Sequence, residues 1–383
     1  MEVMEGMQSG TLTSISPRSL LRDVTIGGPQ WLLAVLVFVS IAGVAYTDSI
    51  VSSISLGYLY FLPLGISAMF LRSKISYGLI VVCVFLHDLF GASYPSPQAR
   101  ITHNLTALAG FTFVVYVIQR YVKEREQLDK AIREQRDQLL QDVELAAQVQ
   151  RMFLPIHRPS IPGLEIAGMM QPARGVGGDY YDYIPIDDHT IKIVVADVAG
   201  KGVPAALLMS ATAAAVQLEA TEKQDMLAVV GRLNSAIHSV SDGGRYVTLV
   251  LADIDARSRS LRYVNCGHNP ALLYQAKTRD VIPMNSSCPP VGMFSAEACE
   301  ISRTDLADGD TLVLYTDGIT EAENPEGEEF GMERLSALIR DNHMLSADGM
   351  MNRILERVTD FSREVGFNDD VTILVVKCNF DGA

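Results

Sequence analysis

The first third of the chain alternates between long apolar runs and short polar segments. The apolar runs cover Trp31–Tyr46, Ile50–Leu71, Ile75–Phe90 and Thr106–Ile118. A bilayer-spanning helix needs about 20 residues, so the second run is long enough alone and the others need their semi-polar flanks. A signal peptide does not explain the first run, because it starts late and three similar runs follow. The pattern predicts a polar tail over residues 1–30 and a transmembrane domain of four helices over residues 31–120.

The basic residues between these runs orient the predicted bundle. With the N-terminus inside, the inner segments hold Arg18, Arg22, Arg72, Lys74, Arg120, Lys123 and Arg125. The outer loops hold only Arg100. Cytoplasmic loops are enriched in Lys and Arg, so we expect both ends of the bundle to face the cytoplasm.

Three ionisable residues, His87, Asp88 and His103, lie in or beside the third and fourth runs. Ionisable groups at membrane depth are candidates for function, and a proton, a metal or a haem are all open. A pair of helix ends at the level of the lipid headgroups explains them too. We favour that simpler interpretation, because short helices bring such groups close to the interface.

A helix without Gly or Pro is predicted next, and it ends at Pro155. Ten core positions follow one another in alternating steps of four and three residues, and seven of them are apolar. These positions are Tyr121, Arg125, Leu128, Ile132, Gln135, Leu139, Asp142, Ala146, Val149 and Phe153. This spacing is typical of a coiled coil, so we expect a linker over residues 121–155 that pairs with a second copy. The alternative is a single helix packed on the following domain.

The remaining residues, 156–380, form a separate domain in which aspartates flank apolar strands. Asp179 precedes the strand Tyr180–Ile186, and Asp197 follows Ile191–Val195. Asp317 follows a strand that begins at Thr311, and Asp369 and Asp370 precede the last one. Any one of these could simply cap a turn. Together they predict a carboxylate cluster, which needs cations to offset its repulsion. All-oxygen ligands suit Mg²⁺ or Mn²⁺, and two such ions activate water for attack on phosphorus.

Composition and charge sharpen this division of the chain. The 383 residues have a net charge of −14 and are 48% hydrophobic, with a mean hydropathy of +0.18. Residues 1–120 are nearly neutral, so the acidic excess lies in the second part. That excess argues against a nucleic-acid partner. The five cysteines form no CxxC pair, so we expect reduced, packed thiols and no thiolate zinc site.

Other chemistries find less support. No P-loop and no GxSxG nucleophile motif is present. His268, in the sequence Gly-His-Asn-Pro, could act as an acid, but this is also turn chemistry, and we favour the turn.

Five segments in order resemble a known family: GGDYYD, ADVAGKGVPAALLM, NCGHNPALLY, LYTDGITEAENPEGEEFG and NDDVTILVV. They are similar to the bacterial stage II sporulation E-type phosphatases, a branch of the metal-dependent type 2C protein phosphatases. ELAAQVQRMFLP is similar to the entry helix of the environmental-stress sigma-factor phosphatases. The resemblance covers roughly residues 140–380. It implies an α/β/β/α sandwich of two antiparallel sheets flanked by helices, and the whole chain is then of the α+β class.

The resemblance also implies roles for individual residues. Asp197 would bridge two Mn²⁺ or Mg²⁺ ions, and the carbonyl of Val198 would bind one of them. Asp317 and Asp369 would complete the metal shell, with Asp369 preferred over Asp370. Asp179 would hold a metal or its water, and with Asp197 it would carry the catalysis. No arginine matches a phosphate clamp, and Arg174 is the nearest candidate.

The resulting expectation is a membrane-anchored protein serine/threonine phosphatase in the bacterial inner membrane, with its catalytic domain in the cytoplasm. The resemblance implies a phosphorylated STAS-type anti-anti-sigma factor as substrate. A catalytically silent scaffold with the same fold is the main alternative, and the intact aspartates argue against it. A hydrolase of small phosphates is a third reading, which the absence of a nucleotide-cradling loop disfavours.

Overall fold

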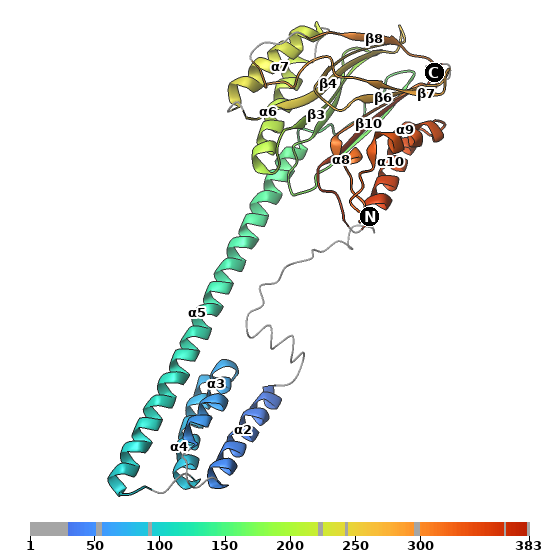
Figure 1. Ribbon diagram of the computed structural model, residues 1–383. Helices are drawn as coiled ribbons and strands as arrows, with labels where there is room; N and C mark the ends of the chain where they lie inside the picture. Colours follow the sequence, from blue (N-terminus) through green and yellow to red (C-terminus); the bar gives the residue numbers. More distant parts are fainter. Residues whose placement is uncertain are drawn as a thin grey trace. The chain divides into compact units, whose positions relative to one another are not determined.

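The computed structural model describes residues 30–50, 56–90, 94–220, 225–241, 244–294, 299–363 and 365–380. The chain divides into two compact units, Met1–Gln138 and Leu139–Ala383. Helix α5 (Pro97–Arg151) contributes to both of them (Figure 1). The predicted polar tail, with Arg18 and Arg22, lies outside the described residues.

Among the described residues of the first unit, four helical segments pack around one apolar core. They are α2 (Gln30–Ile50), α3 (Phe61–Phe70), which follows the 3₁₀ turn η1 (Gly57–Tyr60), α4 (Ser73–Phe90) and the first part of α5. Their shared core includes Ile41, Leu64, Cys83 and Val115. Large apolar side chains such as Phe85 and Phe113 are more than 60% exposed on the outside of this bundle, as expected for a surface that faces lipid rather than water.

The lengths of these helices differ from the predicted ones. Among the described residues, three helices are long and apolar enough to cross a membrane, and they begin at Trp31, Ser73 and Pro97. The run Ile50–Leu71 was expected to be long enough to span a bilayer alone. Its first residue ends α2, residues 51–55 lie outside the described part, and the described remainder is helical over Gly57–Phe70. The fourth run and the predicted linker are one helix, which ends at Arg151, four residues before Pro155.

The second unit is a sandwich of two five-stranded antiparallel sheets, as the resemblance implied. One sheet has the order β1-β10-β9-β6-β7 and the other β2-β3-β4-β5-β8. The strands are β1 (Leu164–Gln171), β2 (Tyr180–Pro185), β3 (Thr190–Val198), β4 (Val247–Asp255), β5 (Ser260–Cys266), β6 (Ala271–Gln275), β7 (Asp280–Met284), β8 (Ser302–Asp305), β9 (Thr311–Tyr315) and β10 (Val371–Cys378).

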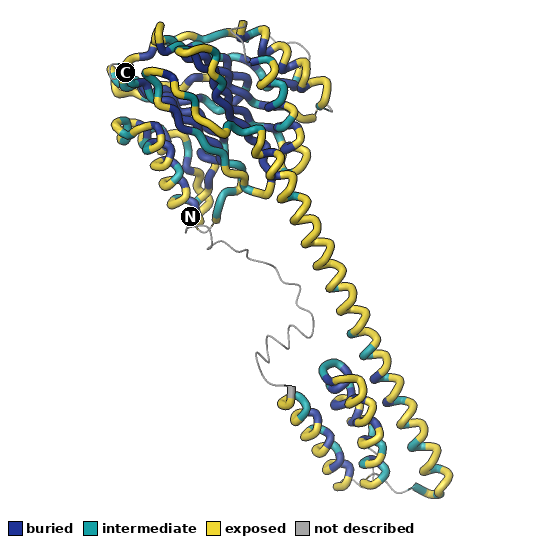
Figure 2. Tube along the Cα trace, turned by 180° about the vertical axis from the view of Figure 1, so that it is seen from behind, coloured by how far each residue is buried: buried dark blue, intermediate teal, exposed yellow. Residues whose placement is uncertain are grey.

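Helices cover the outer face of each sheet. Helices α6 (Val203–Glu219) and α7 (Met226–Val240) bury an apolar face against β3 and β4. Helices α9 (Gly331–Asp341) and α10 (Ala347–Ser362) do the same against β9 and β10. A third apolar layer lies between the sheets, because alternate residues of each buried strand point inward. Figure 2 shows these strands as the most deeply buried part of the unit.

The cysteines depart from expectation in one place. Cys83, Cys266 and Cys378 are free and buried, as predicted. Cys288 and Cys299 are joined by a disulfide, with their Cα atoms 4.8 Å apart. Sequence spacing gave no sign of this contact, because it depends on the packing that brings Cys288 and Cys299 together.

A charged ladder crosses the second sheet on three neighbouring strands. Lys192 Nζ lies 2.6 Å from Asp253 Oδ1, and Arg262 Nη2 lies 2.8 Å from Asp253 Oδ2. The Lys192 side chain is 1% exposed and that of Asp253 is 8% exposed. A buried charge that loses its partner is strongly destabilising, so Asp253 holds two cations in place.

We therefore expect Asp253→Ala to lower the free energy of unfolding by about 3–5 kcal/mol, because it leaves the Lys192 ammonium buried without its partner. Lys192→Met leaves Asp253 paired with Arg262, so its loss should be smaller, about 1–2 kcal/mol. Urea denaturation of both variants measures the difference. An equal or reversed order would contradict this account of the ladder.

Candidate metal centre

Strand register brings the predicted aspartates together in two groups. Tyr180 at the start of β2 pairs with Ala196 near the end of β3, so Asp179 and Asp197 lie side by side. Ile373 of β10 pairs with Tyr315 at the end of β9, which places Asp369 and Asp370 beside Asp317. The first pair belongs to one sheet and the second group to the other. The site therefore lies where the ends of both sheets meet.

Asp179 is held from the opposite sheet. The hydroxyl groups of Thr316 and Thr372 both donate to Asp179 Oδ2, each at 2.6 Å. Burial raises the pKa of Asp179 well above its usual value, the neighbouring Asp197 adds to this, and the two hydroxyl groups oppose it. Two donors on one oxygen fix the orientation of the carboxylate.

Burial and the other carboxylates of the cluster act on the pKa of Asp197. Burial, followed by repulsion from Asp317 and Asp369, raises its pKa to about 7. The pKa of Asp317 is raised for the same reasons, with burial first and Asp369 second. Carboxyl groups that repel one another in this way bind a proton or a cation more readily. Asp197, Asp317 and Asp369 therefore lie close enough for their charges to act on one another.

The two consecutive aspartates at the start of β10 play different roles. Asp370 accepts hydrogen bonds from the backbone amides of Ala173 (2.8 Å) and Gly178 (2.6 Å). Asp369 Oδ2 instead lies 2.6 Å from Lys201 Nζ, and its side chain is 32% exposed. Asp370 thus fastens the loop that carries Asp179, whereas Asp369 faces the open side of the cluster.

Two cationic side chains border the carboxylates. Lys201, which also donates to the carbonyl of Asn368 at 3.1 Å, lies in the turn between β3 and α6. The Arg174 side chain is exposed, and its charge acts on Lys201. Arg174 was expected from the sequence as the nearest candidate for a phosphate clamp. Lys201 was missed, although it stands in the conspicuous motif AGKG.

His268 is buried behind the cluster and does not face solvent. Its Nε2 donates to the carbonyl of Tyr315 at 3.0 Å, and its Nδ1 lies 2.8 Å from Thr248 Oγ1. Burial lowers the pKa of His268 to about 4, so the ring is neutral at pH 7. These contacts agree with the structural interpretation of the GHNP segment.

Helix α5 reaches this site through Gln150. The side chain of Gln150 donates to the carbonyl of Gly177 (2.6 Å) and accepts from its amide (3.1 Å). Gly177 lies two residues before Asp179, so the end of the linker helix is hydrogen-bonded to the loop that positions the Asp179 carboxylate. Nothing in the sequence distinguished Gln150 from its polar neighbours.

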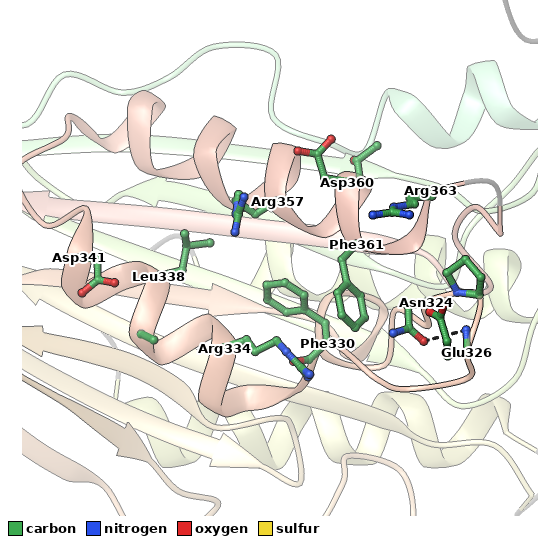
Figure 3. Close-up of a pocket in the computed structure, with 13 residues that line it drawn as sticks. Asn324, Glu326, Phe330, Arg334, Leu338, Asp341, Arg357, Asp360, Phe361 and Arg363 are labelled. Atoms are coloured by element: carbon green, nitrogen blue, oxygen red, sulfur yellow. Dashed lines mark hydrogen bonds between the residues drawn. The ribbon is translucent and has the colours of Figure 1, made fainter.

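The five aspartates of the candidate metal centre do not line the large pocket that Figure 3 shows. That pocket, of about 1030 Å³, lies between α9, α10 and the loop around Asn324. The guanidinium group of Arg334 stacks 5.0 Å from the ring of Phe361 there. Its three arginines are accompanied by three carboxylates, Glu326, Asp341 and Asp360, so no net charge selects a ligand.

Comparison with known proteins identifies the second unit. The family model described as "Stage II sporulation protein E (SpoIIE)" matches residues 187–379. The chain belongs to this family. The resemblance noted from the motifs is thereby confirmed, and the match begins after Asp179.

Relatives and solved structures extend this comparison. Phosphoserine phosphatase RsbU of Bacillus subtilis is 27% identical over 286 residues, which cover 74% of this chain and 82% of RsbU. Phosphoserine phosphatase RsbP of the same organism is 28% identical over 186 residues, which cover 47% of this chain and 45% of RsbP.

Among solved structures, the SiaA-PP2C domain of Pseudomonas aeruginosa has a TM-score of 0.56 at 23% identity, over 64% of this chain and 98% of that domain. The RsbU and RsbW domains of Rv1364c from Mycobacterium tuberculosis give a TM-score of 0.51 at 24% identity, over 59% and 63% of the two chains. These likenesses show the fold, in agreement with the expected sandwich.

Gly318 makes the close approach of β9 and β10 possible. A Cβ atom at this position would lie 2.0 Å from the carbonyl oxygen of Asp370. We expect Gly318→Ala to force the two aspartate-bearing segments apart and to cost about 3 kcal/mol or more in stability. Gly231→Ala, on the exposed face of α7 with no atom within 4 Å, should stabilise by up to about 1 kcal/mol. Denaturation of both variants is the measurement, and an unchanged Gly318→Ala midpoint would refute the contact.

Proposed function

We propose that the chain is a metal-dependent protein serine/threonine phosphatase that hydrolyses phosphoserine or phosphothreonine on a cytosolic regulator. The observation that carries this proposal is the convergence of five aspartates from two sheets, with Asp197 repelled by Asp317 and Asp369. Membership of the SpoIIE family and the similarity to two proteins named phosphoserine phosphatases support it. A silent scaffold would not need to keep such a costly cluster of buried charges.

The residues present fit two divalent ions. Asp179, Asp197, Asp317 and Asp369, together with the backbone carbonyl of Val198, are the proposed ligands. The Val198 oxygen faces Gly178, next to Asp179, since a Cβ at Gly178 would lie 3.3 Å from it. Among the described residues no three acidic, His or Cys side chains already stand in metal-binding geometry, so small side-chain rotations would accompany binding.

Each part of the chain then has a chemical task. Bound Mn²⁺ or Mg²⁺ would supply Lewis acidity and a water of lowered pKa. Asp179, fixed by Thr316 and Thr372, and Asp197 would orient the ions and act as the catalytic carboxylates. Lys201 and Arg174 would attract the phosphate of the substrate, because they are the cations at the rim of an otherwise acidic site.

The proposed substrate is a phosphorylated STAS-type anti-anti-sigma factor, and the proposed pathway is sigma-factor regulation. This follows the family resemblance of the five motifs rather than a feature of the site itself. The acidic second half of the chain remains unsuited to nucleic acid.

The first unit is proposed to anchor the chain in the bacterial inner membrane, with several passes and the catalytic domain in the cytoplasm. Three long apolar helices support the anchor. Arg72, between α3 and α4, and Lys74, in the first turn of α4, support the orientation, because basic residues stay on the cytoplasmic side.

A second copy of the chain is the proposed partner of the linker helix. Leu128, Ile132 and Leu139 of the predicted seam are 60%, 54% and 66% exposed, and much of α5 is exposed in Figure 2. Within the second unit, Val143 and Ala147 near the end of α5 pack against Val176 and Ala206. A homodimeric coiled coil would cover the exposed stripe.

The activity is tested by phosphate release from a phosphorylated STAS protein in the presence of Mn²⁺. We expect Asp197→Ala to reduce the rate by at least on the order of 100-fold, comparable to the loss of a preorganised electrostatic group. Asp280→Ala, an exposed carboxylate on β7, is the matched control and should keep full activity. Retained activity in Asp197→Ala would exclude the proposed metal centre.

Metal binding should depend on pH with a defined sign. Because the pKa of Asp197 is raised to about 7, protons compete with the ion below that pH, and the folded state without metal loses stability as pH rises from about 4 through 7. We expect Mn²⁺ affinity to rise about tenfold between pH 6 and 8, and the Mn²⁺-induced increase in Tm to be larger at pH 8.

The difference in Tm with and without Mn²⁺ is the quantity to measure. It removes the effect of His268, whose lowered pKa of about 4 acts in the opposite direction, because that group stabilises the fold as pH rises from about 4 to 6.5. Asp197→Asn should abolish the pH dependence of the difference. A difference that is independent of pH in the parent chain would contradict the assignment.

A further inference from the structure

A second cluster of titratable side chains lies inside the first unit, far in sequence from the aspartates. Asp48 near the end of α2 and His87 near the end of α4 are each 1% exposed. His87 Nδ1 donates to Asp48 Oδ2 at 2.8 Å. The other carboxylate oxygen accepts from the backbone amide of Leu56 at 3.1 Å. The carboxylate therefore fixes both the orientation and the tautomer of the His87 ring.

His103, in the second turn of α5, faces the other side of this ring. Its Nε2 lies 3.0 Å from His87 Nε2. The ring centroids are 5.1 Å apart, which exceeds the nitrogen separation by nearly two ring radii, so the nitrogens point toward each other. Because His87 Nδ1 keeps its proton and donates it to Asp48, the His87 Nε2 lone pair is directed at His103, whose Nε2–H donates to it when no ion is bound. An ion would replace that proton and bind both nitrogens.

We propose that His87 and His103 form a binding site for a divalent transition-metal ion, with Asp48 as the carboxylate that orients His87. A metal with nitrogen ligands at about 2.0–2.1 Å in tetrahedral geometry separates those nitrogens by about 3.3 Å. The observed separation of 3.0 Å is close to that value. A carboxylate on the far nitrogen of a ligating histidine is the usual outer contact of such sites.

The neighbouring carboxylate, Asp88, is held by other partners. Asp88 does not compete for the ion, because Arg100 binds both of its oxygens and Asn104 donates to it at 2.7 Å. The Tyr60 ring packs edge-on to His87 at 6.2 Å. Its buried hydroxyl has no hydrogen-bond partner among the described residues, and water carried by an ion would supply one.

The shape of the bundle supports a specific role for His87. A Cβ atom on Gly57 would lie 2.7 Å from the His87 ring, so only glycine admits the imidazole here. The ends of α2, α4 and α5 meet at one end of the bundle (Figure 1), which is the outer end in the proposed orientation. His103 is partly exposed there, and this gives an ion a route to the pair.

The ligand chemistry selects the class of ion. Imidazole nitrogens suit Zn²⁺, Co²⁺, Ni²⁺ and Cu²⁺, whereas Mg²⁺ prefers oxygen. The described residues offer two protein ligands and no group of three or more, so water would complete the coordination. Such a site exchanges its ion with the medium, and it differs in chemistry from the all-oxygen aspartate cluster.

The test is a Co²⁺ titration of the full-length, tag-free chain in lipid nanodiscs, with excess Mg²⁺ to occupy the aspartate cluster. Uptake is followed by equilibrium dialysis and by the visible absorption of nitrogen-ligated Co²⁺. We expect one saturable Co²⁺ ion per chain. His103→Gln and His87→Ala should each weaken binding at least tenfold, and Asp48→Asn should weaken it 10–100-fold.

His157→Ala, an exposed histidine in the second unit, is the matched control and should bind as the parent does. His103→Gln is the decisive variant, because this partly exposed position tolerates change, and circular dichroism verifies its helical content. Unchanged binding in His103→Gln, or no saturable Co²⁺ in the parent chain, would overturn the proposal. The proposal would also be overturned if a change of pH altered the His87–His103 pair and Co²⁺ did not. Phosphatase activity is not part of this readout, so the two proposals fail separately.

Discussion

Repulsion among buried carboxylates is the constraint on which the second unit depends. Asp179, Asp197 and Asp317 have raised pKa values because the fold removes them from water and places them beside one another. A fold tolerates this only where other interactions hold the segments together. Here the hydroxyl groups of Thr316 and Thr372, and the backbone amides bound by Asp370, supply that restraint. These hydrogen bonds thus hold the aspartates in place against a mutual repulsion that a bound cation would offset.

The architecture explains why so few residues can build this site. Antiparallel register places the start of one strand beside the end of the next, so each sheet contributes adjacent carboxylates without any loop of special shape. Gly318 then allows the chain after β9 to touch the chain before β10. The apolar layers on both faces of each sheet make this framework rigid. Family membership and the sandwich fold agree with this arrangement.

Much of this could be predicted from the sequence, and the reasons are specific. Buried strands such as β3 and β10 are largely apolar, and their flanking aspartates were visible beside them. Thr316 and Thr372 were missed because a hydroxyl group next to an aspartate has no distinctive pattern. Gln150, Asp48 and the contact of Cys288 with Cys299 were missed because each depends on packing between distant segments. The short helix in Gly57–Phe70 was overestimated because hydropathy alone does not locate a helix start.

The division of the carboxylates between two sheets has a mechanical consequence. Asp179 and Asp197 move with one sheet, whereas Asp317 and Asp369 move with the other. The gap between them is set by the side chains sandwiched in the middle layer, among them Val195, Val250 and Leu374. An ion bound by both groups would hold the two sheets at a fixed relative position. By thermodynamic reciprocity, any sliding of one sheet against the other would lower the affinity for the ion. The apolar layer between the two sheets therefore sets the distance between the two groups of aspartates, although it contacts no substrate.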